Sequence, residues 1–170
     1  MEELRESMEA DFPAILELNK AEEQQTSPMD LAKLRMLVDI SAYCKVVTID
    51  GQVAAFLLAM RDGVPYESDN YAWFASRFRS FLYVDRVVVD SRLSRRGLGS
   101  MLYGDLFEFA RSEGIIRITC EYNIVPPNPA SRAFHDRFGF RELGTQWVAN
   151  GAKRVSLQAA DPGKHHPKRS

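Results

Sequence analysis

The strongest constraint on the fold is the stretch Asp-Ser-Arg-Leu-Ser-Arg-Arg-Gly-Leu-Gly-Ser-Met-Leu at residues 90–102. It follows an apolar run of Val87, Val88 and Val89, which is typical of a central strand buried on both faces. Beyond the first glycine, apolar residues recur at the intervals of three and four that mark one face of a helix. They are Leu98, Met101, Leu102, Leu106 and Phe109. The sequence therefore predicts a strand, a glycine-containing turn and a helix in succession.

A helix that begins at such a turn can bind an anion. Its first backbone N–H groups have no partner within the helix, and its N-terminus carries a partial positive charge. Arg95 and Arg96 would add charge-assisted hydrogen bonds. A Walker loop is excluded because Ser100, not lysine, follows Gly99, and a dinucleotide fingerprint is excluded because Leu102 replaces its third small residue. The competing interpretation is a plain connection with solvated arginines.

Residues 95–100, Arg-Arg-Gly-Leu-Gly-Ser, resemble the pyrophosphate loop of the GNAT superfamily of acyl-CoA-dependent N-acetyltransferases. That loop reads Gln/Arg-x-x-Gly-x-Gly/Ala, and Ser94 occupies its first position here. The resemblance implies that the pyrophosphate of acetyl-CoA (coenzyme A) is held along this loop, and that the strand before it contacts the pantetheine arm through its backbone. The cofactor-binding residues implied in these two segments are Val87, Val88, Val89, Arg95, Arg96, Gly97, Leu98, Gly99 and Ser100.

A second motif lies between residues 120 and 140. Asn128 is a good helix N-cap, Pro129 suits the first helical position, and Gly139 suits the end of the helix. Within this helix, Asn128, Ser131 and His135 form a polar stripe. The expected core face consists of Ala130, Ala133, Phe134 and Phe138.

The spacing of this motif resembles the second GNAT signature, Asn-x-x-Ala/Ser-x-x-Leu/Phe-Tyr-x-x-x-Gly-Phe. The resemblance implies that Asn128, Ser131 and Phe134 contact the cofactor. His135 stands where the family has a tyrosine that protonates the departing thiolate. Histidine can supply that proton only as an imidazolium, whereas a tyrosine donor is neutral. The alternative is that His135 only makes a hydrogen bond within its helix.

Acetyl transfer to an amine also needs a base, because an amine with a pKa of ~10.4 is protonated near neutral pH. Glu121 is the best placed carboxylate, since it ends a predicted strand of residues 115–122 and ribosomal-protein alanine acetyltransferases have a base glutamate at a similar place. Asp85, on the strand of residues 81–89, is the competitor. A salt bridge with Arg86 or another basic residue is the alternative role for Asp85.

The acceptor site is expected in the long connection of residues 62–80, because long connections in compact domains are often binding loops. Aromatic residues beside carboxylates suit an amine-bearing substrate. The candidates are Tyr66, Tyr71, Trp73 and Phe74. The alternative is a short helix over residues 71–78 that packs these aromatics on the core or on a second subunit, so a homodimer is one possibility.

Along the chain, apolar patterns and turn residues predict alternating strands and helices, and their order is that of the GNAT fold. Strands are expected over residues 2–7, 44–49, 52–60, 81–89, 115–122, 141–149 and 153–157, with helices around Ile15, after Ser27, over 98–113 and over 129–138. The pattern predicts an α/β fold class with a mixed sheet. The resemblance to the GNAT fold implies that this sheet is mostly antiparallel, with helices on both faces and splayed central strands. We expect one domain over residues 1–160 and a disordered tail over 161–170.

Composition narrows the choice of function. A chain of 170 residues with 45% hydrophobic residues supports one substantial core, and a net charge of −1 leaves no field for nucleic acid or anionic lipid. The sequence has no membrane-spanning or signal segment, which indicates a cytoplasmic protein, and Cys44 and Cys120 are expected to be buried thiols. No metal site is expected. The predicted function is an N-acetyltransferase acting on a primary amine by direct attack in a ternary complex, and the alternative is a non-catalytic acyl-CoA sensor.

Overall fold

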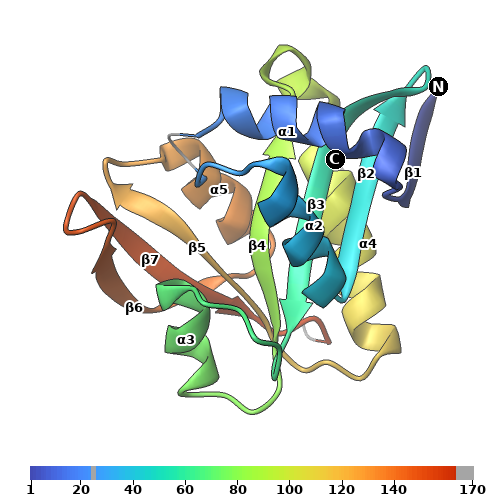
Figure 1. Cartoon of the computed structure of the whole chain (residues 1–170). Coiled ribbons are helices and arrows are strands. Elements are labelled where there is room, and N and C mark those ends of the chain that lie inside the picture. Colours follow the sequence, from blue (N-terminus) through green and yellow to red (C-terminus); the bar gives the residue numbers. More distant parts are fainter. Residues whose placement is uncertain (24–25, 164–170) are drawn as a thin grey trace. The chain divides into compact units, whose positions relative to one another are not determined.

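A computed structural model describes residues 1–23 and 26–163 of the chain, which form an α/β fold (Figure 1). The strands are β1 (Glu2–Glu6), β2 (Tyr43–Ile49), β3 (Gln52–Arg61), β4 (Leu82–Val89), β5 (Ile118–Val125), β6 (Arg141–Val148) and β7 (Lys153–Ala160). The helices are α1 (Phe12–Ala21), α2 (Leu31–Ile40), α3 (Asp69–Ala75), α4 (Leu98–Ser112) and α5 (Pro129–Arg137), with 3₁₀ turns η1 (Glu9–Asp11) and η2 (Ser91–Arg96).

The strands join in the order β1-β2-β3-β4-β5-β7-β6. Antiparallel ladders join β1 to β2, β2 to β3, β5 to β7 and β6 to β7. The ladder between β4 and β5 is parallel and short, pairing Leu82 with Ile118 and Tyr83 with Thr119. The predicted mixed and mostly antiparallel sheet is confirmed, and a two-pair ladder between eight-residue strands is in line with the predicted splaying of the central strands.

The chain forms two compact units. Unit 1 comprises Met1–Met60 and Val84–Leu106, and unit 2 comprises Arg61–Tyr83 and Phe107–Ser170. Most of the predicted tail, including His165 and His166, lies outside the described residues. No helix within the described parts of the chain is long and apolar enough to cross a membrane.

Unit 1 contains the first three strands and the later part of β4. Asp50 and Gly51 both have positive φ angles, 50° and 82°, which is the backbone of the tight hairpin that an Asp-Gly pair predicts between β2 and β3. In Figure 1, α1 and α2 lie on one face of these strands and the first part of α4 on the other. On the α4 side, the hydroxyl of Tyr43 and the ammonium of Lys45 both contact Asp105 of α4, at 2.7 and 2.8 Å.

Unit 2 contains β5, β7 and β6, with α3 and α5 on opposite faces. Side chains alternate between the two faces along a strand, so Glu121 and Tyr122 of β5 point in opposite directions. Glu121 is hydrogen-bonded to Asn70 of α3, and the ring of Tyr122 lies 5.5 Å from that of His135 of α5. Residues of β7 and β6 in register with Glu121 therefore share the α3 face.

Some predicted details of packing are wrong. On α4 the fully buried residues include Tyr103 and Phe107, while Met101 and Phe109 are half-buried. Val88 is buried but Val87 and Val89 are half-buried, so β4 has one fully covered face here rather than two. The helix expected after Ser27 begins three residues after Pro28, because Asp30 is its N-cap and accepts a hydrogen bond from the Lys33 N–H.

The core face of α5 also differs from its prediction. Phe138 is buried, as predicted, and Phe134 is half-buried, but Ala130 and Ala133 are exposed and His135, which was placed on the polar stripe, is buried. The helix is rotated so that the imidazole, rather than the alanine methyl groups, packs against the sheet, because burying the larger rings removes more apolar surface from water. Cys44 and Cys120 are free and buried, as the sequence predicts.

Candidate active site

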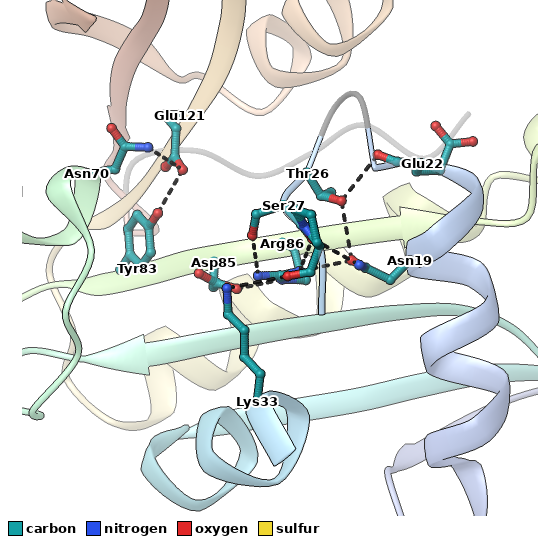
Figure 2. Close-up of polar contacts among 11 residues, drawn as sticks. Asn19, Glu22, Thr26, Ser27, Lys33, Asn70, Tyr83, Asp85, Arg86 and Glu121 are labelled. Atoms are coloured by element: carbon teal, nitrogen blue, oxygen red, sulfur yellow. Dashed lines mark hydrogen bonds and ion pairs between the residues drawn. The ribbon is translucent and has the colours of Figure 1, made fainter. Parts of the chain in front are cut away.

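Glu121 lies at the centre of a hydrogen-bond cluster in unit 2. Its Oε1 accepts a hydrogen bond from the hydroxyl of Tyr83 at 2.7 Å and another from Nδ2 of Asn70 at 3.0 Å (Figure 2). The hydroxyl comes from β4, the amide from α3 and the carboxylate from β5. Two neutral donors on one carboxylate stabilise its ionised form, because they bond to the charge without neutralising it. An ionised, oriented carboxylate is what a general base requires.

The cluster extends to β6 through Gln146. Its Nε2 donates to Oδ1 of Asn70 at 2.8 Å. Neither Asn70 nor Gln146 was predicted as a site residue, because the two are 76 residues apart and neither belongs to a spaced motif. The amide of Asn70 within an aromatic, acidic connection was the one local signal for a polar group there.

Two of the four aromatic residues predicted to bind the acceptor belong to the core. Tyr71 and Phe74 of α3 are buried, and their rings pack against Phe81 and Tyr83. The hydroxyl of Tyr71 also donates to the carbonyl of Arg61. This arrangement is the short helix that the sequence left open as the alternative.

Trp73 and Tyr66 have more exposed positions. Trp73 lies between Arg77, whose guanidinium is 3.6 Å from the ring centroid, and Gly144 of β6. Tyr66 is half-buried, with its ring 6.4 Å from that of Tyr83. Of the four predicted acceptor residues, Tyr66 therefore combines partial exposure with a position next to a residue that contacts Glu121.

Asp85 and Arg86 form a buried ion pair in unit 1. Arg86 Nε lies 2.6 Å from Asp85 Oδ2, and the two side chains are 2% and 4% exposed, respectively. Arg86 also donates to Asn19 Oδ1 at 2.9 Å and to both the carbonyl and the hydroxyl oxygen of Ser27 (Figure 2). The geometry is that of the salt bridge that the sequence left open for Asp85.

His135 is buried against the α5 side of β5. Its Nδ1 lies 2.7 Å from the carbonyl oxygen of Ser131 and 3.2 Å from the Ser131 hydroxyl. Because a carbonyl oxygen only accepts, Nδ1 carries the proton and donates it. Burial lowers the pKa of His135 from 6.5 to about 4, although the Ser131 carbonyl and Asp136 oppose that shift. The imidazole is therefore neutral at neutral pH, which disfavours a cationic general acid.

The other residues of the second motif have local roles. Oδ1 of Asn128 accepts a hydrogen bond from the Ser131 N–H, so Asn128 is the N-cap of α5 as predicted. Phe134 is half-buried, with its ring 5.2 Å from that of Phe138. The Asn128 carboxamide oxygen and the Ser131 hydroxyl are thus already engaged within α5.

The glycine turn before α4 starts the helix at a left-handed residue. Gly97 has a φ of +72°, in the left-handed region that glycine adopts without strain, and α4 begins at Leu98. The first hydrogen bond of this helix runs from the Met101 N–H to the Gly97 carbonyl. The N–H groups of Leu98, Gly99 and Ser100 therefore precede the helical ladder. Arg95 and Arg96 are exposed, and Arg96 Nε lies 3.7 Å from Glu2.

The seven-stranded sheet, with a glycine turn between β4 and α4, is a fold that this chain shares with solved structures of acetyltransferases. The chain belongs to the acetyltransferase (GNAT) family, whose model matches residues 1–140. A phosphinothricin N-acetyltransferase from Streptomyces coelicolor is 46% identical over 50 residues, which are 29% of this chain and 28% of that protein. The chain thus aligns with little more than a quarter of that curated relative.

Solved structures share the fold at low sequence identity. Ard1 from Thermoplasma volcanium aligns with a TM-score of 0.78 at 16% identity, over 94% of this chain and 97% of its own. A chain of the NatC complex, in a structure bound to Gag peptide and coenzyme A, aligns with a TM-score of 0.73 at 13% identity, over 94% of this chain and 98% of its own. At such identities the likeness supports the fold and not the acceptor.

Proposed function

We propose that the protein is an N-acetyltransferase that transfers the acetyl group of acetyl-CoA to a primary amine, with Glu121 as general base. The observation that carries this proposal is the carboxylate of Glu121, which accepts hydrogen bonds from Tyr83 and Asn70 on one oxygen. Membership of the acetyltransferase (GNAT) family supports the reaction class, and the matched residues 1–140 include parts of both units, in support of one catalytic domain.

The glycine turn is the proposed pyrophosphate site. It offers the N–H groups of Leu98, Gly99 and Ser100 at a helix N-terminus, and Arg95 and Arg96 supply exposed positive charge beside them. This donor set fits a phosphate ester. When bound, acetyl-CoA supplies the acetyl group as an activated thioester, and β4 is the proposed backbone partner of its pantetheine arm through Val87 to Val89.

Glu121 takes one proton from the acceptor. A primary amine is largely an ammonium ion near neutral pH, and only its lone pair can attack the thioester carbonyl. The nitrogen gives up two protons as it becomes an amide. Glu121 would accept the first, directly or through one water, which frees the lone pair so that the C–N bond can form. As the C–S bond breaks, the second proton of the nitrogen would pass through water to the sulfur, and coenzyme A would leave as the free thiol. His135 is not the proposed donor of that proton, because its pKa is lowered to about 4.

The acceptor is proposed to approach Glu121 from the α3 face of β5. Tyr66 and Tyr83 lie close together there, and aromatic rings beside a carboxylate favour a cationic amine. The name of the Streptomyces relative places phosphinothricin among the acceptors to test, beside free amino acids, polyamines and peptide N-termini.

The test is a panel of amines with free thiol release as the readout. Glu121→Gln should lower turnover with the best acceptor by about 10²-fold while leaving acetyl-CoA affinity unchanged, the range expected for loss of a general base. Asp85→Asn is the matched carboxylate control, and it should lower stability rather than abolish turnover. If Asp85→Asn alone abolishes turnover, Asp85 is the base. Tight acetyl-CoA binding without thiol release for any amine would favour the sensor function.

A further inference from the structure

The side-chain amides of Gln146 and Asn70 form a chain of hydrogen bonds that ends on the Glu121 carboxylate. The acetyl-transfer reaction itself does not need this chain. Gln146 Nε2 donates to Asn70 Oδ1 at 2.8 Å, and Asn70 Nδ2 donates to Glu121 Oε1 at 3.0 Å. The Glu121 carboxylate fixes the direction of these hydrogen bonds, because an ionised carboxylate can only accept them. The nitrogen of Asn70 must then face Glu121, which turns its oxygen toward Gln146.

The elements that carry this chain are fixed against each other within unit 2. A Cβ atom on Gly144 would lie 2.7 Å from Cζ2 of Trp73, so the indole rests directly on the backbone of β6. Asn70 precedes Trp73 by three residues on α3 and therefore lies on the same side of that helix. Gln146 follows Gly144 by two residues on β6 and points to the same face. The glycine lets α3 approach closely enough for the two amides to meet.

We propose that Asn70 and Gln146 are positioning residues for Glu121, which hold its carboxylate ionised and in one orientation on the α3 face of β5. The inference rests on the proposed function of Glu121 as general base. Gln146 acts through Asn70, because its donor fixes which end of the Asn70 amide meets the carboxylate. Without Gln146, the Asn70 amide can rotate and turn its oxygen toward Glu121. That oxygen carries partial negative charge and would repel the carboxylate.

The side chains described around Glu121 come from β4, α3 and β7. Tyr83 from β4 and Asn70 from α3 are its hydrogen-bond donors, and Leu157 of β7 lies beside it in register. Of these facing side chains, the phenol of Tyr83 is the titratable one. Arg154 of β7 points to the opposite face of the sheet from Glu121, where it donates a hydrogen bond to the Thr145 hydroxyl. A carboxylate introduced at residue 70 would lie within hydrogen-bond distance of Oε1 of Glu121, where the Asn70 amide lies now.

The test is Asn70→Asp, which keeps the shape and replaces a donor by a second carboxylate. Two carboxylates at hydrogen-bond distance cannot both ionise readily, so the pair retains a proton to higher pH. We expect the pKa of the Glu121 carboxyl to rise by on the order of one unit or more. Carbon-13 NMR of protein labelled in its glutamate and aspartate carboxyls measures this, with Glu121→Gln assigning the signal.

Gln146→Leu is the second variant, because it keeps the bulk and removes the distant donor. It should raise the same pKa by less than Asn70→Asp does, and it should lower kcat by about 10-fold with an unchanged KM for acetyl-CoA. Asn150→Asp is the matched control, since it adds the same charge at the exposed turn between β6 and β7. It should leave both the pKa and kcat as in the parent protein.

The outcomes separate this inference from the proposed function. If both variants keep the parent thermal transition and the Glu121 pKa does not move, the positioning role is wrong. If Asn70→Asp fails to fold, Gln146→Leu decides alone, and an unchanged pKa in it overturns the inference. If the pKa moves in both variants while the pH dependence of kcat/KM does not follow, Asn70 and Gln146 do position Glu121 but Glu121 is not the base.

Discussion

The hydroxyl of Tyr83 donates to Oε1 of Glu121 across 2.7 Å, so a phenol on β4 supports the proposed base on β5. A hydrogen bond to a charged group contributes about 1.5–3 kcal/mol, and 1.4 kcal/mol corresponds to one unit of pKa. Because the bond favours the ionised carboxylate, its loss should raise the pKa of Glu121 and narrow the pH range in which the base works.

Tyr83→Phe removes that bond and keeps the ring. The acidic limb of kcat/KM should move to higher pH by about one unit, and turnover at neutral pH should fall several-fold. Tyr71→Phe is the matched control, because its hydroxyl bonds the Arg61 carbonyl and not Glu121. The pH–rate profile of each variant measures the effect. A profile of Tyr83→Phe that overlays that of the parent enzyme contradicts the supporting role.

His135 should make the protein less stable as the pH falls. Burial lowers its pKa to about 4 in the folded protein, while the unfolded value is ~6.5. Between these values the unfolded chain binds more protons, so the free energy of unfolding decreases as pH drops from about 6.5 to about 4. The full effect is at most ~3 kcal/mol. The rings of Tyr122, Phe134 and Phe140 lie around the imidazole, and Asp136 and Ser131 of α5 are polar groups near it.

Urea unfolding at a series of pH values measures this contribution. In His135→Phe, the decrease between about pH 6.5 and pH 4 should be smaller than in the parent by a similar amount. Groups that titrate alike in both proteins cancel in the difference. An identical pH dependence in parent and variant shows that the histidine is as accessible to protons when folded as when unfolded.

The same histidine should not set the alkaline limb of the rate profile. A general acid with a pKa near 4 is almost wholly deprotonated at pH 7, so it has no proton for the thiolate. His135→Tyr, which restores the residue of the family motif, should retain turnover and show no new alkaline limb near pH 7. Steady-state kcat from pH 6 to pH 9 tests this. An alkaline limb that is present in the parent and lost in His135→Phe restores the imidazolium as the acid.

Short-range sequence signals predicted the turns, the helix cap and the order of the elements. The contacts between residues far apart in the sequence were not predicted. The Asp-Gly turn, the cap at Asn128 and the glycine before α4 act over a few residues, and the structure has each of them. The buried face of α5 depends on what packs against it, so apolar periodicity correctly predicted Phe138 but wrongly placed Ala130 and Ala133 in the core and His135 outside it. Glu121 contacts residues that are 38 and 51 positions away in the sequence, and Asn70 contacts Gln146. No regular sequence spacing indicates such contacts.

Arg86 should be essential for stability rather than for acetyl transfer. It joins Asp85, Asn19 and Ser27 in unit 1 through a guanidinium that is almost fully buried. Removing one partner of a buried ion pair leaves an uncompensated charge and costs about 3–5 kcal/mol. Arg86→Met should therefore lower the free energy of unfolding by an amount in that range, measured by urea titration. In Asp85→Asn with Arg86→Met, no charge remains buried, and part of the loss should be recovered. Equal stability of Arg86→Met and the parent contradicts the buried pair.

Gly99 should control cofactor affinity through the N-terminus of α4. Its N–H precedes the first helical hydrogen bond, which Met101 makes to Gly97, and the proposed guest there is the pyrophosphate of coenzyme A. Gly99→Asp places a negative charge and a side chain at this end of the helix, so it should raise the Kd for coenzyme A by about 10-fold or more in titration calorimetry.

Gly104→Asp is the control, because the same charge is added in the middle of the same helix, where a Cβ atom meets nothing within 4 Å. It should change the Kd by no more than about twofold. The weakening in Gly99→Asp should shrink as salt is added, since screening reduces repulsion between exposed charges. If a folded Gly99→Asp binds coenzyme A as tightly as Gly104→Asp does, the pyrophosphate lies elsewhere on the protein.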